Sequence, residues 1–201
     1  TLALSEPWAA GTPVFIDAAA GDIHVRGTDG DKVEVNATRV VWVDSASKAP
    51  AALDALNVKI QKLADRIAVT SVAPPDTPEP NGSYRIDLDI AVPRAATVEV
   101  QALQGLLALN DLAGTVKATQ TLGMITVEKT LGPLTLGNRS GGVQVKGATG
   151  PIDANVRNGD IMVERSSGKI TAQCLQGRTI IESPLGEVLS LIHTPSPRDQ
   201  R

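Results

Sequence analysis

Aromatic side chains are scarce in this sequence, at 2% of 201 residues. A core without them has to be assembled from thin layers of Val, Ile, Leu and Ala, which suits a narrow stack of short strands better than a sandwich. Cysteine is nearly absent too, because Cys174 is the only one. An intrachain disulfide is therefore excluded, and cysteine usage does not fix the compartment.

Charge of one sign is also lacking, since the formal net charge is −3. Such a chain has no long-range field that would recruit nucleic acid, and no basic stripe with interleaved aromatics is present. No apolar run approaches the roughly 20 residues of a membrane-spanning helix. We therefore expect no nucleic-acid partner and no membrane span in this chain.

Glycine is abundant in the second half of the sequence and recurs there every nine residues. Between the glycines, apolar residues lie two apart, as in residues 123–127 (Gly-Met-Ile-Thr-Val), which is the period of a strand with one buried face. Glycine tolerates the positive φ that a tight corner can require. Each unit is therefore one short strand plus one corner. The predicted structural corners are Gly105, Gly114, Gly123, Gly132, Gly141, Gly150, Gly159, Gly168, Gly177 and Gly186.

Alternate units differ in the size of their fifth residue, so the true repeat has eighteen residues. Val127 and Val163 are large, whereas Ala118 and Ala154 stand in the intervening units. A unit this short cannot bury its apolar face alone, and stacking has to do so. We predict an all-β fold: a β-solenoid with eighteen-residue coils of two short strands, stacked ~4.8 Å apart. One outward ladder should contain Asn110, Glu128, Lys146, Glu164 and Glu182.

Residues 1–93 are predicted to form an irregular β-rich region with one short helix and a proline-rich loop. Ser47 is a candidate cap for a helix with Pro50 in its first turn. Residues 53–63 fit either a longer helix face or, with 67–69, a strand hairpin, and their β-branched residues favour the hairpin. Residues 73–83 read as the loop, and 84–92 alternate cleanly as a strand. The solenoid is placed at 94–188, and 189–201 are interpreted as a non-native or disordered tail.

Residues that could carry chemistry are few, and each has a structural explanation. His24 falls at an outward strand position, and Cys174 falls where Val156 stands one coil earlier, a place for a small buried residue. Asp87 and Asp89 share a strand face, and residues 29–31 (Asp-Gly-Asp) read as a turn, without the further carboxylates of a calcium loop. We therefore predict no catalytic residue, no cofactor and no metal site.

The passage from Tyr84 to Val100, with its Val-Pro-Arg step at 92–94, leads directly into the glycine-punctuated units. That order resembles the bacterial putative-adhesin β-strand-repeat family of domains of unknown function, over most of residues 13–188. The resemblance implies an envelope or secreted protein and supplies no catalytic residue. The expected function is a non-enzymatic adhesin or surface scaffold, binding a surface protein or carbohydrate or associating with itself through an open solenoid end.

Two other functions remain open, and residues 189–201 have an explanation of their own. An uncapped coil favours end-to-end pairing, as in bactofilin-like cytoskeletal scaffolds. A carbohydrate-active β-helix enzyme ranks last, because the nine-residue spacing contains no insertion that could build a cleft. Residues 189–193 (Leu-Ser-Leu-Ile-His) resemble the translation of a transposon-type sequencing adapter, so His193 is given no functional weight.

Overall fold

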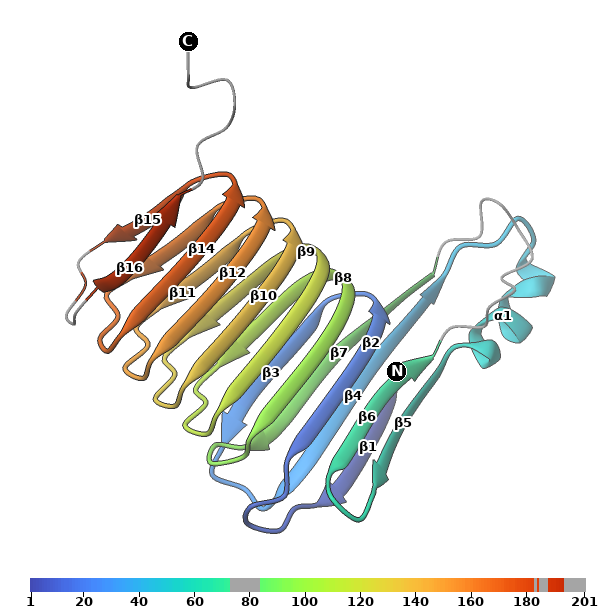
Figure 1. The fold of residues 1–201 in the computed structure, drawn as a ribbon. Helices are drawn as coiled ribbons and strands as arrows, with labels where there is room; N and C mark the ends of the chain where they lie inside the picture. The colour runs from blue at the N-terminus through green and yellow to red at the C-terminus, as the bar shows by residue number, and fades with distance from the viewer. Residues whose placement is uncertain (73–83, 183, 185–187, 194–201) are drawn as a thin grey trace.

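The computed structural model describes residues 1–72, 84–182, 184 and 188–193. These residues form an all-β fold with one short α-helix, as predicted, and the sheet is open (Figure 1). No helix among them is long and apolar enough to cross a membrane. The elements, in chain order, are β1 (Leu2–Pro7), β2 (Val14–Ala20), β3 (Ile23–Thr28), β4 (Lys32–Val41), η1 (Ala46–Lys48), α1 (Ala49–Ala55), β5 (Asn57–Lys62), β6 (Ile67–Val72), β7 (Tyr84–Pro93), β8 (Val98–Asn110), β9 (Val116–Glu128), β10 (Leu134–Ser140), β11 (Val143–Lys146), β12 (Ile152–Asn158), β13 (Ile161–Glu164), β14 (Ile170–Gln176), β15 (Thr179–Glu182) and β16 (Val188–His193).

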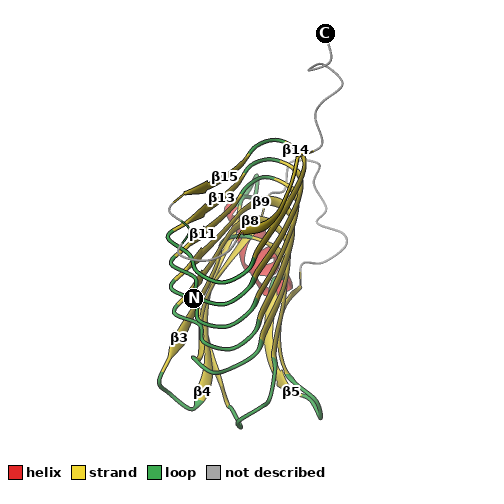
Figure 2. Cartoon of the chain, turned by 60° about the vertical axis from the view of Figure 1, so that its left-hand side comes forward, coloured by secondary structure: helices red, strands yellow, loops and turns green. Residues whose placement is uncertain are grey.

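The strands lie in two layers, because β8 and β9 each run through a corner from one layer into the other. The first layer has the order β5-β6-β2-β8-β9-β10-β12-β14-β16, and the second has the order β1-β4-β7-β3-β8-β9-β11-β13-β15. Figure 2 shows the two layers side by side, joined by loops at both edges. We call one pass of the chain through both layers a rung.

Neighbouring rungs pair in parallel with an offset of eighteen residues. In the first layer Val98 pairs with Val116, which pairs with Leu134. In the second layer Ile125 pairs with Val143, which pairs with Ile161. The eighteen-residue repeat of the sequence is thus the hydrogen-bonding register of the sheet. Both strands of every repeat keep this register through residue 182.

The N-terminal region adds rungs to the same stack, in an order that differs from the chain order. β2 and β3 pair directly with the two halves of β8, at Val14–Val98 and Ile23–Leu107. β6 and β7 then pair with the other sides of β2 and β3. The rung made by β2 and β3 therefore lies between the rung of β6 and β7 and that of β8. Hydrogen bonding continues across the predicted boundary between residues 93 and 94.

Antiparallel strands close the N-terminal end of the stack. β5 pairs antiparallel with β6, and β4 with β7, while β1 pairs antiparallel with β4. β1 and β5 contact each other, and Leu4 and Ile60 pack against the core from these two strands. The predicted hairpin of β5 and β6 is confirmed. This end is thereby covered by side chains, as a terminal rung requires.

The core consists of aliphatic columns that run through the stack between the two layers. Val127, Val145 and Val163 form one such column and are all buried. A second column is polar for two rungs, because Gln120 and Asn138 are buried there. Asn138 Nδ2 donates to the carbonyl oxygens of Gly123 (2.8 Å) and Gly142 (3.0 Å). Such amides satisfy corner carbonyls that a purely aliphatic column would leave unpaired.

The corner from the first layer to the second requires glycine for two reasons. At Gly159, φ is +141°, a value that L side chains rarely adopt. A Cβ at Gly159 would also overlap the carbonyl oxygen of Gly141 on the preceding rung. The same combination recurs at Gly21, Gly105, Gly123, Gly141 and Gly177.

The opposite edge uses a different conformation from the one that the glycine period suggests. Gly114, Gly132 and Gly150 have no positive φ, but a Cβ there would overlap the backbone of the preceding rung. Gly168, the next glycine at this edge, does have a positive φ (+95°). In all four loops a residue with positive φ also lies three positions earlier. It is Asp111 (φ +57°), Lys129 (+52°), Gly147 (+68°) and Arg165 (+46°).

Some expectations differ from the structure, and others fall on residues outside the described ranges. The helix cap at Ser47 is wrong: Ser47 lies in η1, and α1 starts at Ala49 with Lys48 as N-cap and no side-chain cap. Residues 189–193 lie in β16, which pairs in parallel with β14. The proline-rich loop at 73–83, the corner at Gly186 and residues 194–201 fall outside the described residues.

Candidate binding surface

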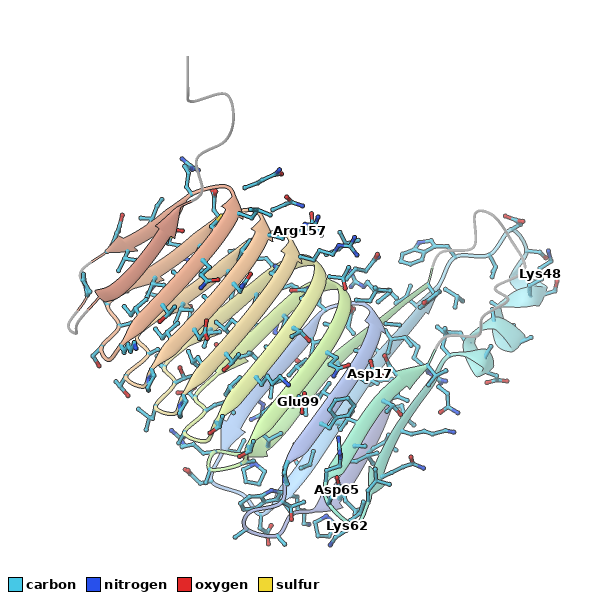
Figure 3. All side chains as sticks on the ribbon, viewed as in Figure 1. Asp17, Lys48, Lys62, Asp65, Glu99 and Arg157 are labelled. Carbon is cyan, nitrogen blue, oxygen red and sulfur yellow. The ribbon has the colours of Figure 1, made fainter. Side chains whose placement is uncertain are left out.

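An open groove of about 520 Å³ crosses the outer face of the first layer, over β6, β2, β8 and β9. In Figure 3 this face is turned toward the viewer, with Asp17 on β2 and Glu99 on β8. The groove runs across the strands and follows the stacking direction, because its lining residues come from consecutive rungs. They are Asp17, Ala18, Ala19, Ser71, Val72, Gln101, Ala102, Leu103, Thr119, Gln120 and Thr121.

The groove lies where the pairing ladder of the strands is interrupted. The pairing of β2 with β8 passes from Ala18–Ala102 directly to Ala20–Gln104. The pairing of β8 with β9 passes from residues 102 and 120 to 104 and 122 in the same way. Ala18, Ala102 and Ser71 are buried and lie beneath the groove near the corner.

The two walls of the groove differ in polarity. Asp17, Gln101 and Thr119 form one wall, and their Cα positions are paired in register across β2, β8 and β9. They offer a carboxylate, an amide and a hydroxyl in a row, one per rung. Val72 and Leu103, each about half exposed, stand on the other wall together with Ala19 and Thr121. An elongated ligand with one polar and one apolar side would match both walls.

Gln120 fixes the shape of the groove from beneath. Its side chain is 4% exposed, and its Nε2 donates to the carbonyls of Gly105 (2.6 Å) and Leu122 (3.1 Å). Its Oε1 is buried and has no partner among the described residues. These two hydrogen bonds fix the Gln120 amide against the backbone of the corner. The sequence did not predict this buried position, because a glutamine in a strand is expected to point outward.

The outward ladder predicted from the repeat is present in the second layer. Asn110 pairs with Glu128, Glu128 with Lys146, Lys146 with Glu164, and Glu164 with Glu182. No ion pair joins Lys146 to either glutamate within the described residues, and Gln144 donates to Glu164 (3.5 Å). This ladder is a solvated face in the structure.

The individual candidates for chemistry lie apart from one another. His24 is exposed on β3, and Cys174 is buried in the column of Asn138, as its position predicted. Cys174 Sγ donates to the carbonyl of Gly159 (3.1 Å), and burial raises the pKa of this thiol. Among the described residues, no group of three or more His, Cys, Asp or Glu could hold a metal ion.

Three aspartates serve the glycine corners instead of forming a site. Asp87 accepts a hydrogen bond from the Asp22 amide (2.9 Å), and Asp22 accepts one from the Leu106 amide (2.9 Å). Asp160 accepts from the Arg178 amide (2.8 Å) and side chain (2.9 Å), and the side-chain hydrogen bond lowers the pKa of Asp160. These carboxylates tie each corner to a corner of the adjacent rung.

Comparisons with known proteins found similarity to solved structures alone. No protein-family model matches the chain, and no curated protein matches it. A putative cell adhesion protein from Clostridium sporogenes aligns over 90% of this chain and 98% of its own, at 9% identity and a TM-score of 0.34. A putative adhesin from Bacteroides fragilis aligns over 90% and 96%, at 14% identity and a TM-score of 0.29. A putative adhesin from Parabacteroides distasonis aligns over 90% and 97%, at 12% identity and a TM-score of 0.24. Values this low establish neither a shared fold nor a shared function.

Proposed function

We propose that this chain is a non-enzymatic β-solenoid protein of the cell envelope or the secreted fraction, which acts as an adhesin or assembly scaffold. The solenoid is residues 94–188, extended at its N-terminal end by the rungs of β2–β3 and β6–β7. The protein binds an extended segment of a partner protein in the groove on its first layer. The observation that carries this proposal is the row of Asp17, Gln101 and Thr119 beside an apolar wall.

The geometry of the groove suits an extended polypeptide. Amide and hydroxyl side chains can pair with the N–H and C=O groups that such a segment presents at every residue. Alternate side chains of an extended segment point to opposite sides, so one set can contact Val72 and Leu103 while the other faces solvent. Among the described residues that line the groove, Asp17 is the only charged one, and it selects a segment with a basic residue.

A rigid stack supports such binding at low entropic cost. The groove residues lie on strands that are hydrogen-bonded on both sides, since β2 lies between β6 and β8, and β8 lies between β2 and β9. The residues beneath the groove are buried and already ordered before a ligand arrives. Preorganisation of this kind raises affinity, because fewer side chains are immobilised on binding.

A peptide-display experiment tests the proposal with a matched control on the same face. Peptides selected against the full chain should lose binding to the Gln101→Ala, Thr119→Ala variant. The control is Asn155→Ala, Gln173→Ala, which changes the same outward column on β12 and β14, away from the groove. Equal binding to both variants would contradict the groove as the site. A hydrolase or transferase activity abolished by one groove substitution would contradict the non-enzymatic function.

A further inference from the structure

A second surface lies at the glycine-corner edge, where the chain passes from the first layer to the second. We call it the corner ridge and define it by Leu103, Leu122, Met124, Arg139, Arg157 and Arg178. These residues flank the corners of five consecutive strands of the first layer and their continuations into the second. Arg157 is labelled at this edge in Figure 3.

The first part of the ridge is apolar and exposed. Leu103 is 49% exposed, Leu122 47% and Met124 40%, and they come from the adjacent strands β8 and β9. At the opposite edge Leu131, at 57%, is the one large exposed apolar residue in the described loops between the layers. A gathering of large apolar side chains at one edge marks an interaction surface, whereas single exposed ones are ordinary.

The second part of the ridge is basic. Arg139 and Arg157 are exposed at equivalent positions of β10 and β12, one rung apart, and neither has an ion pair or hydrogen bond within the described residues. Like charges on neighbouring rungs repel each other, and an anionic ligand would relieve this. The carboxylate beside them, Asp160, is already held by Arg178. Three arginines and one aspartate leave a formal charge of +2 there.

Carboxylates near the apolar part are engaged as well. Asp22 accepts the hydrogen bond from Leu106, and Asp87 forms an ion pair with Arg85 (2.6 Å). Asp22 keeps its negative charge, because the amide that donates to it is neutral, whereas Asp87 is paired with Arg85. With Asp22 counted, the three arginines and two aspartates leave a formal charge of +1 next to exposed leucine and methionine. Apolar side chains next to arginines complement a surface whose apolar interior lies beneath an anionic layer.

We propose that the corner ridge binds the surface of an anionic lipid bilayer. Leu103, Leu122 and Met124 enter the boundary between headgroups and acyl chains, while Arg139 and Arg157 pair with lipid phosphates, which arginine recognises bidentately. The ridge needs no shaped pocket for this purpose, because lipids rearrange around it. The ridge shares Leu103 with the apolar wall of the peptide groove, but Leu122, Met124 and the arginines do not line the groove.

Vesicle cosedimentation of the full chain tests this proposal. The protein should bind vesicles of phosphatidylcholine mixed with phosphatidylglycerol, and added salt should weaken that binding. Arg139→Gln, Arg157→Gln should reduce binding about 30-fold, at about fivefold per arginine. Leu122→Gln, Met124→Gln should also reduce it, whereas the exposed-leucine control Leu131→Gln should leave it unchanged.

The following results would overturn the proposal of lipid binding. No binding to the mixed vesicles, equal binding to phosphatidylcholine alone, or an equal loss with Leu131→Gln would each do so. Polyglutamate that binds as tightly as the vesicles, without loss in Leu122→Gln, Met124→Gln, would identify an acidic protein as the partner. The groove variant Gln101→Ala, Thr119→Ala should bind vesicles normally, so the two proposals can fail independently. All these positions lie at the surface, and thermal melts verify that each variant is folded.

Discussion

Gly159→Ala should destabilise the protein more than Gly147→Ala at the other edge of the stack. The new Cβ would overlap the carbonyl oxygen of Gly141, and the backbone at φ +141° is strained for any L side chain. Relieving the overlap moves two rungs apart, and the hydrogen bond from the Gly141 amide to the Asn158 carbonyl (2.8 Å) crosses between them. The Gly159 amide bonds to the Gln176 carbonyl (2.8 Å) on the next rung.

The expected cost combines two contributions. Backbone strain contributes about 1–2 kcal/mol, and each weakened hydrogen bond about 1 kcal/mol, so the free energy of unfolding should fall by about 3 kcal/mol. Gly147→Ala is the control, because φ is +68° but the nearest atom to its Cβ, the Lys129 nitrogen, is 3.9 Å away. That variant should lose only the strain, about 1 kcal/mol. Urea unfolding followed by circular dichroism measures both, and equal losses would refute close rung contact as the reason for glycine.

Four further outcomes follow from burial and backbone geometry. Ile161→Ala should lower the free energy of unfolding, measured with urea, by about 2–5 kcal/mol, and Glu164→Ala should lower it by at most about 1 kcal/mol. Equal losses would mean that the strand faces are misassigned. Asn138→Leu should cost about 2 kcal/mol, since two corner carbonyls lose their donor, and an unchanged melting curve would contradict that role. Arg165→Gly should stabilise by about 0.5–1 kcal/mol because φ is +46°, and a loss of stability would show that the arginine side chain matters more. Cys174 should react slowly with iodoacetamide until urea unfolds the chain, because burial raises its pKa, and fast labelling of the native protein would contradict its buried position.

The repeating part of the fold could be predicted because its register is written as a residue spacing. The buried column of Val127, Val145 and Val163 and the outward positions of their neighbours follow from the eighteen-residue period. Each rung contacts its neighbours at a fixed offset, so local pattern and tertiary pairing coincide. The positive φ at Gly159 was predictable for the same reason.

Two features of the backbone could not be predicted from this pattern. The left-handed residue three positions before the glycine at the other edge is Asp111, Lys129 or Arg165 in three loops and Gly147 in one, so composition gives no signal for it. The placement of β2 and β3 between β6–β7 and β8 depends on pairings over 53 and 84 residues, at Val14–Ile67 and Val14–Val98. No single-sequence period encodes such an order.

The candidate surfaces were the hardest to predict. The lining of the groove combines residues of β6, β2, β8 and β9, which become neighbours only through strand pairing, as Ala18 and Ala102 do. The corner ridge depends on side chains that are exposed near the corners, where the alternation of inward and outward residues breaks down. The eighteen-residue repeat makes Thr121, not Leu122, equivalent to Leu103, yet Leu103 and Leu122 are both about half exposed. The sequence predicted outward binding faces in general but not these two places.

Methyl NOEs in solution test the stacking on which both surfaces depend. With valine methyl labelling, the account predicts cross-peaks between Val127 and Val145 and between Val145 and Val163. It predicts none between Val127 and Val163, which lie two rungs apart. Cross-peaks that join these valines at another offset, or their absence between consecutive members of the column, would contradict the stacked-rung architecture.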